Sequence, residues 1–145
     1  MKRDTDSITG TPSPHPTIGV AVCTPEIQRY VQEIVSAEGI VEIYDCAEDI
    51  LTQVLNGPPS VIIVETESPG FDSLQTVLAI QQHPACRQVK FLLMTSLRIQ
   101  YQQPIREYFE RFGLRLGYVH YIIMPFAPAE LVQYLHYLIT YIPPG

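Results

Sequence analysis

The segment that most constrains the fold of this chain is an apolar run near its middle, Val61–Val64, which ends in an acid, Glu65. In an extended strand these side chains are apolar on both faces, so both faces need a cover. Such a strand belongs in a parallel sheet with helices above and below it. Glu65 then lies at the carboxyl end of the strand, where parallel sheets gather their functional groups.

Four further apolar segments of strand length alternate with helical patterns. Thr24, Pro25 and Glu26 are typical of a helix start, because Thr caps a helix and Pro suits its first turn. The other expected strands are Thr17–Cys23, Ile40–Tyr44, Val89–Thr95 and Tyr118–Ile123. The expected helices are 24–39, Ala47–Asn56, Asp72–His83, Pro104–Phe112 and Ala127–Tyr141. This alternation predicts an α/β fold, a flavodoxin-like (βα)5 doubly wound parallel sheet with strand order 2-1-3-4-5.

The length of 145 residues predicts one domain, over residues 17–142, after a disordered tail of polar residues and proline, 1–16. The tail lacks the apolar stretch of a secretory signal, and no apolar run is long enough to cross a membrane. We therefore expect a cytoplasmic protein without membrane contact.

The net charge of −6 is unevenly distributed along the chain. Residues 1–86 carry three basic and twelve acidic side chains, whereas residues 87–145 carry six basic and three acidic ones. The basic residues are interleaved with acids in an acidic chain, which argues against a nucleic-acid partner.

The three cysteines, Cys23, Cys46 and Cys86, are odd in number and lack the CxxC spacing of metal sites. This argues against a disulfide framework and against zinc, so each cysteine is expected to be a small buried apolar residue. No histidine is placed to activate Cys23 as a nucleophile. We predict no catalytic residue, no metal site and no cofactor, and therefore no enzyme.

The order of these segments resembles the receiver domain of response regulators, from Ile18 to the last helix. In receivers the first strand often leads into Pro-Glu-Ile, and the third strand is followed by Pro-Gly, an apolar residue and Asp. The fourth strand ends in Ser or Thr, and the fifth has an aromatic residue three positions before Lys-Pro. The matching residues are Pro25–Glu26–Ile27, Pro69–Gly70–Phe71–Asp72, Thr95, and Tyr121 before Met124–Pro125. The resemblance implies a CheY-like receiver fold, with Thr95 and Tyr121 at the switch positions.

The sequence departs from receivers where their chemistry takes place. Val22 and Cys23 stand where receivers have an acidic pair that helps to hold Mg²⁺ through oxygen ligands. Glu65 stands at the position of the phosphoryl-accepting Asp, and Met124 at that of the Lys that neutralises the phosphoryl group. These departures imply a degenerate receiver, or pseudo-receiver, that does not take up phosphate by the family's route.

The resemblance and its departures together imply a stand-alone, phosphorylation-independent interaction module in bacterial two-component signal transduction. It would bind a protein partner or a second copy through its fourth helix, fifth strand and fifth helix. Two alternatives remain open. The strand edge near Val22, Cys23, Met124 and Phe126 would hold a small molecule, for example a quinone, or Glu65 would still be phosphorylated in an atypical receiver.

The role of Glu65 also has two interpretations. Its carboxylate would imitate phospho-aspartate, with Thr95 hydrogen-bonded to it and Tyr121 turned inward, as in an active receiver. Alternatively, Glu65 is a solvated acid at a strand end. Thr95 and Tyr121 also have a second interpretation. Thr95 would be an ordinary strand-end side chain, and Tyr121 a core residue with a solvent-exposed hydroxyl.

The last helix carries the candidate interface residues. Tyr134, Tyr137 and Tyr141 form a stripe beside its leucine-rich face, and tyrosine is favoured at interfaces. The region between the fourth and fifth strands would otherwise cover these rings. Arg106 and Arg111 in that region are further candidates, or else pair with the acids four residues away on the same helix.

Overall fold

The computed structural model describes residues 16–68, 70–96, 107, 110–111 and 115–140. Its centre is a sheet of five parallel strands in the order β2-β1-β3-β4-β5, as the sequence predicted. The strands are β1 (Thr17–Ala21), β2 (Ile40–Ile43), β3 (Val61–Glu65), β4 (Lys90–Thr95) and β5 (Val119–Ile123). All five residues of β3 are buried, as expected of the central strand of a covered sheet.

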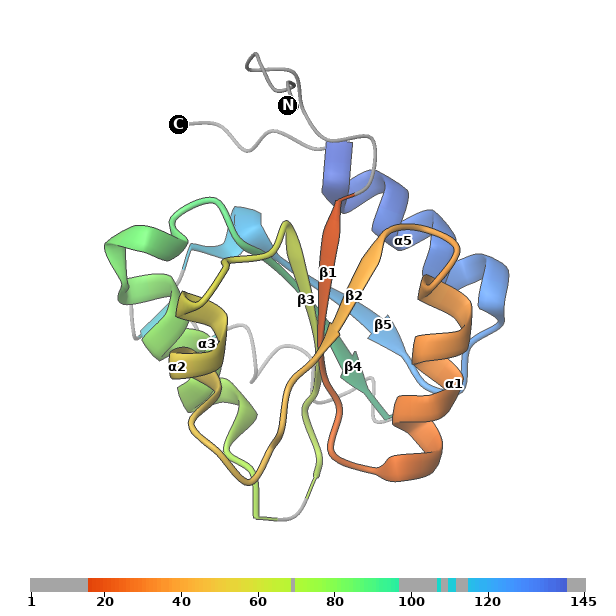
Figure 1. Cartoon of the computed structure of the whole chain (residues 1–145), viewed down its shortest axis with the longest axis horizontal. Helices are drawn as coiled ribbons and strands as arrows, with labels where there is room; N and C mark the ends of the chain where they lie inside the picture. Colours follow the sequence, from red (N-terminus) through yellow and green to blue (C-terminus); the bar gives the residue numbers. More distant parts are fainter. Residues whose placement is uncertain (1–15, 69, 97–106, 108–109, 112–114, 141–145) are drawn as a thin grey trace, which may run out of the picture.

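Helices cover both faces of the sheet (Figure 1). On one side lie α1 (Pro25–Val35) and α5 (Pro128–Thr140), and on the other lie α2 (Ile50–Leu55) and α3 (Ser73–Gln82). Two short 3-10 helices, η1 (Pro84–Cys86) and η3 (Leu116–Tyr118), precede β4 and β5. The sheet therefore separates two apolar cores, one beneath each helix pair.

Side chains of β3 alternate between these cores because successive residues of a strand point to opposite faces. Val61 and Ile63 pack with α1 and α5, whereas Ile62 and Val64 pack with α2 and α3. The α1/α5 core also contains the leucine-rich face of α5, which is formed by Leu131, Leu135 and Leu138.

Two expected helices are shorter in the structure, since α1 ends at Val35 and not near residue 39, and α2 starts late. Helix α2 was expected from Ala47 but begins at Ile50. Asp45 ends the incoming chain in a turn, since its carboxylate accepts the Ala47 amide at 3.0 Å and its carbonyl accepts the Glu48 amide at 3.1 Å. Such local bonds from Asp compete with helix formation.

A close packing contact fixes β1 against the chain that follows β2. The buried ring of Tyr44 lies over Gly19, where a Cβ would come within 2.5 Å of the ring carbon Cε2. Burial raises the pKa of the Tyr44 hydroxyl, and the nearby charges of Glu42 and Cys86 add to this.

The expected fourth helix, Pro104–Phe112, falls mostly outside the described residues, which include only helical positions 107, 110 and 111. The expected tail, 1–16, lies outside them apart from Pro16. In the part of the chain that is described, no helix has the length and apolar character needed to span a membrane.

Candidate functional site

Glu65 ends β3 with its side chain turned into the molecule, where only 4% of its surface is exposed. One carboxylate oxygen, Oε1, accepts hydrogen bonds from the backbone amides of Cys23 and Thr24, each at 3.0 Å. The other, Oε2, accepts the Thr24 hydroxyl at 2.7 Å. The interpretation of Glu65 as a solvated acid is therefore wrong, because its burial is matched by three donors.

The sheet order brings these donors to Glu65. β1 pairs with β3 up to Ala21 and Val64, so the loop after β1 passes the end of β3. Thr24 occupies the N-cap position of α1, but its side chain makes no cap bond and donates to Glu65 instead. A carboxylate beside the start of a helix is also favoured by the helix dipole.

Thr95 makes a different contact from the one suggested by the sequence. Its hydroxyl donates to Oε2 of Glu67 at 3.1 Å, and the Ser96 amide donates to the same oxygen at 2.8 Å. The hypothesis that Thr95 bonds to Glu65 is therefore wrong. Glu67 was missed because it follows the strand by two residues, in a loop whose path the pattern of apolar residues did not define.

Cys23 and Cys46 form a disulfide, with their Cα atoms 5.8 Å apart. The expectation that the cysteines are separate buried residues is wrong for this pair and holds for Cys86, which is free and buried. The register explains the pairing, because Val20 lies opposite Ile43 and each cysteine follows its strand residue by three positions. The two loops leave the sheet side by side, and the sulfurs meet.

Known structures resemble this arrangement, although no family model and no curated protein matches the sequence. A candidate response regulator from Chloroflexus aurantiacus superposes with a TM-score of 0.72 at 19% identity, over 88% of this chain and 99% of that one. Chemotaxis protein CheY4 of Vibrio cholerae has a TM-score of 0.70 at 17% identity, over 86% and 98%. The receiver domain of a sensor histidine kinase from Pseudomonas aeruginosa, with coordinated magnesium, has a TM-score of 0.69 at 19% identity, over 88% and 99%.

The chain has the receiver fold. Strand order, parallel pairing and coverage of nearly the whole neighbouring chains agree on this point. At these identities the likeness concerns the fold, so the chemistry of the site has to be argued from its own residues.

The residues at the strand edge of this receiver fold do not fit Mg²⁺. Val22 is fully buried and apolar, and the sulfur of Cys23 is bonded to Cys46. Both oxygens of Glu65 already accept hydrogen bonds, whereas Mg²⁺ requires an octahedron of oxygen ligands. Over the described residues, no cluster of three or more His, Cys, Asp or Glu side chains has the arrangement of a metal site.

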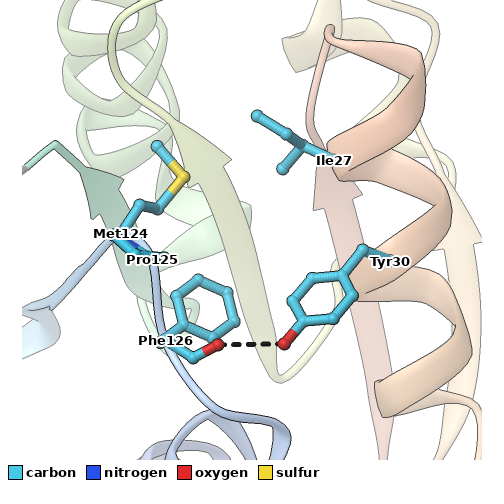
Figure 2. A pocket seen from close by; sticks show the side chains of 5 residues that line it. All are labelled: Ile27, Tyr30, Met124, Pro125 and Phe126. Atoms are coloured by element: carbon cyan, nitrogen blue, oxygen red, sulfur yellow. Dashed lines mark hydrogen bonds between the residues drawn. The ribbon is translucent and has the colours of Figure 1, made fainter.

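Met124, at the position of the family's Lys, helps to form an apolar pocket (Figure 2). The pocket has a volume of about 430 Å³ between α1 and the loop after β5. Its lining residues are Ile27, Tyr30, Met124, Pro125 and Phe126. The hydroxyl of Tyr30 donates to the Phe126 carbonyl at 2.9 Å, which joins the two sides of the pocket (Figure 2). Val22 and Cys23, which the sequence placed beside this pocket, are not among the residues that line it.

The predicted interface residues lie apart from this edge of the receiver fold. Tyr137 on α5 is 49% exposed, and its ring meets that of His120 on β5 edge-to-face at 5.3 Å. Tyr134 is half-buried against the α1/α5 core. These three rings line a groove of about 400 Å³ together with Glu130 and Gln133. We call this groove and its five lining residues the tyrosine face.

Four further predicted residues do not line this groove in the part of the chain that the structure describes. Arg111 is exposed in a helical position, whereas Arg106 and Tyr141 lie outside the described residues. Tyr121 is half-buried and packs against the α2/α3 core, with its hydroxyl shielded from solvent.

The stability of the protein should depend on pH through His120, which lines the tyrosine face. Burial lowers the pKa of His120 and the charge of Lys90 lowers it further, against an opposing backbone hydrogen bond at Gly117. The unfolded chain therefore binds a proton at higher pH than the folded one, and stability is fully present above the unfolded pKa of about 6.5 and declines as pH falls below it. We expect His120→Phe to reduce this decline in urea titrations between about pH 7.5 and about pH 5.5. An unchanged decline would contradict the assignment to His120.

Proposed function

We propose that this chain is a signalling module with the receiver fold that acts by binding a protein, without phosphorylation. It would work as a stand-alone pseudo-receiver in the cytoplasm of a bacterium, in a two-component pathway. The observation that carries the proposal is the state of Glu65, whose buried carboxylate accepts three hydrogen bonds from the β1–α1 loop. Contact with a partner is then the remaining means of passing on a signal.

The surroundings of Glu65 support this proposal on chemical grounds. A phosphoryl acceptor needs an accessible oxygen and cationic groups that stabilise the charge of the transferred group. Attack by Glu65 would break its bonds to Cys23 and Thr24, and the uncharged Met124 stands at the family's Lys position. The residues present favour a structural carboxylate over a reactive one.

The tyrosine face supplies a surface suited to binding. Tyr137 presents a large, rigid and half-exposed ring, and its contact with His120 holds that ring in place. Aromatic anchors of this kind contribute much of the energy of protein interfaces because they bury a large area at a small cost in entropy. We therefore assign Tyr134 and Tyr137 to the docking surface, with the exposed Arg111 as a further candidate.

The proposal predicts that Tyr137→Ala weakens binding about tenfold or more, because loss of an aromatic anchor costs about 2 kcal/mol. Self-association is measured by light scattering, and partner capture is measured by pull-down from the source cell. Leu55→Ala is the matched control, since it removes an exposed apolar side chain from α2, on the other side of the sheet. Equal binding by wild type and Tyr137→Ala would overturn the assignment of this face.

Independence from phosphate is tested on the same protein with Mg²⁺ and beryllofluoride, a phosphoryl mimic. We expect neither the binding nor the amide signals of Glu65 and Thr95 to change. Chemical-shift changes clustered at these two residues would instead favour the alternative of an atypical receiver phosphorylated at Glu65.

A second function, small-molecule sensing, is favoured by the pocket at Met124 and Phe126. Its volume of about 430 Å³ lies in the range of ligand sites, and its lining is apolar with one hydroxyl at the rim. A soluble benzoquinone is a suitable probe. If the pocket binds it, amide signals near Ile27 and Met124 shift, and Ile27→Trp, which fills the pocket, abolishes the shifts. No shifts at the solubility limit of the quinone would count against sensing of this class.

A further inference from the structure

The disulfide lies at the carboxyl edge of the sheet and is not enclosed by the core. Cys23 and Cys46 are both half-buried. They line an open hollow of about 390 Å³ together with Gln28, Tyr44 and Asp45, among others. Thiol–disulfide exchange requires in-line approach of a thiolate to one sulfur, so access of this kind is the first condition for exchange in the folded protein.

Each cysteine is held in place by bonds that do not involve sulfur. On one side, the Cys23 amide donates to Glu65 at 3.0 Å. On the other, Gln53 of α2 accepts the Asp45 amide at 2.8 Å and donates to the Asp45 carbonyl at 2.9 Å. Pairing of β1 with β2 continues to the Tyr44 amide, which donates to Val20 at 2.9 Å. The two thiols of the reduced protein therefore remain neighbours, and the disulfide can form again without refolding.

We propose that Cys23 and Cys46 form a reversible thiol–disulfide site, reduced by a dithiol, and that its state controls the order of the loop that binds Glu65. In the forward reaction a thiolate of the dithiol attacks one sulfur and the S–S bond breaks, giving a mixed disulfide. The second thiol of the reductant then displaces the protein sulfur. Overall, two electrons and two protons pass to the protein, and the reductant becomes a cyclic disulfide. A disulfide oxidant reverses the sequence.

The link to Glu65 is direct, because the residue that carries one sulfur also carries one of the donors. The Cys23 amide and its neighbour, the Thr24 amide, share Oε1 of Glu65. The disulfide joins this loop to the β2–α2 loop and so restricts its motion. Reduction removes that restraint at the point where Glu65 is bound, and we expect the loop to open more often.

The proposed cytoplasmic location is a further reason to expect that the disulfide is reversible. In this step the inference rests on the proposed function, which places the chain in a bacterial cytoplasm. Disulfides that form in that compartment are mostly transient or redox-sensing rather than structural. Reversible thiol–disulfide exchange would explain why a Cys23–Cys46 disulfide occurs in a cytoplasmic protein.

The first test counts thiols in the full-length protein, by mass spectrometry after alkylation in denaturant. Cys86 is the internal reference, since it is free and buried in the α2/α3 core. We expect one alkylated cysteine in the air-oxidised protein and three after native incubation with dithiothreitol. Removal of the reductant and addition of oxidised glutathione should restore one. A pair that is reduced only in denaturant, or that never forms, would overturn the proposal.

The second test measures hydrogen exchange at single amides in the oxidised and reduced proteins. We expect reduction to lower the protection of the Thr24 amide about tenfold or more, while the Tyr44 amide, bonded to Val20, is unchanged. Cys46→Ser should match the reduced protein in either condition. Equal protection of Thr24 in both states would overturn the link to Glu65. Neither test involves a binding partner, so failure here is distinct from failure of the docking proposal.

Discussion

Replacing Glu65 with alanine is expected to lower the free energy of unfolding by about 2–4 kcal/mol. The carboxylate satisfies the amides of Cys23 and Thr24 and the Thr24 hydroxyl, and its removal leaves these donors without their partner in a part-buried site. Hydrogen bonds to a charged group contribute more than neutral ones, and unsatisfied donors carry a desolvation penalty. Urea unfolding followed by circular dichroism measures the change.

Two variants show whether the hydrogen bonds are the cause. Glu65→Gln keeps an oxygen for the two amides and offers an amide group to the Thr24 hydroxyl, so we expect a loss of only about 1 kcal/mol. Glu67→Ala removes an exposed carboxylate two residues further on, which holds Thr95 and Ser96. Its effect should stay below that of Glu65→Ala. A change of under about 0.5 kcal/mol for Glu65→Ala would contradict the structural role assigned here.

Gly19→Ala is expected to destabilise the protein by about 2 kcal/mol, because the added Cβ would overlap a buried aromatic ring. The added Cβ would lie 2.5 Å from Cε2 and 2.8 Å from the hydroxyl oxygen of Tyr44. The ring is buried, so it has to move into side chains already packed around it, or β1 has to shift. The unfolding free energy, again from urea titration, gives the magnitude.

The partner in this clash can be identified by a double variant. Tyr44→Leu removes the ring atoms, so we expect Gly19→Ala to cost little in that background, with a coupling energy of about 1–2 kcal/mol. Gly57→Ala is the matched control, because a Cβ there meets no atom within 4 Å. Equal costs of Gly19→Ala in both backgrounds would show that the strain arises elsewhere.

Most of the fold was predictable because apolar segments define strands and helices through their period. Val61–Val64 required cover on both faces, and the alternation of segments then led to the observed strand order. Boundaries were less predictable where polar side chains bind the backbone. Asp45 turns the chain before α2, and the sequence pattern alone extended the helix back to Ala47.

The candidate site was predictable as a location but not in its bonds. Strand ends brought Cys23, Thr24 and Glu65 together, as a parallel sheet requires. Which carboxylate Thr95 meets depends on the path of a loop, and the sequence contains no period from which to infer it. The disulfide did leave a signal, because Cys23 ends one predicted strand and Cys46 follows its predicted neighbour in the sheet. Counting cysteines and searching for CxxC ignored that neighbourhood.

The alternation of β3 side chains gives each face of this protein its own spectroscopic reporter. Ile62 and Ile63 are consecutive in the chain, yet the methyl groups of Ile62 lie in the α2/α3 core and those of Ile63 in the α1/α5 core. With isotope-labelled isoleucine methyls, a partner that binds over α5 should perturb Ile63 first, whereas rearrangement near α2 should perturb Ile62. One peptide bond thus separates two probes that respond to events on opposite sides of the sheet.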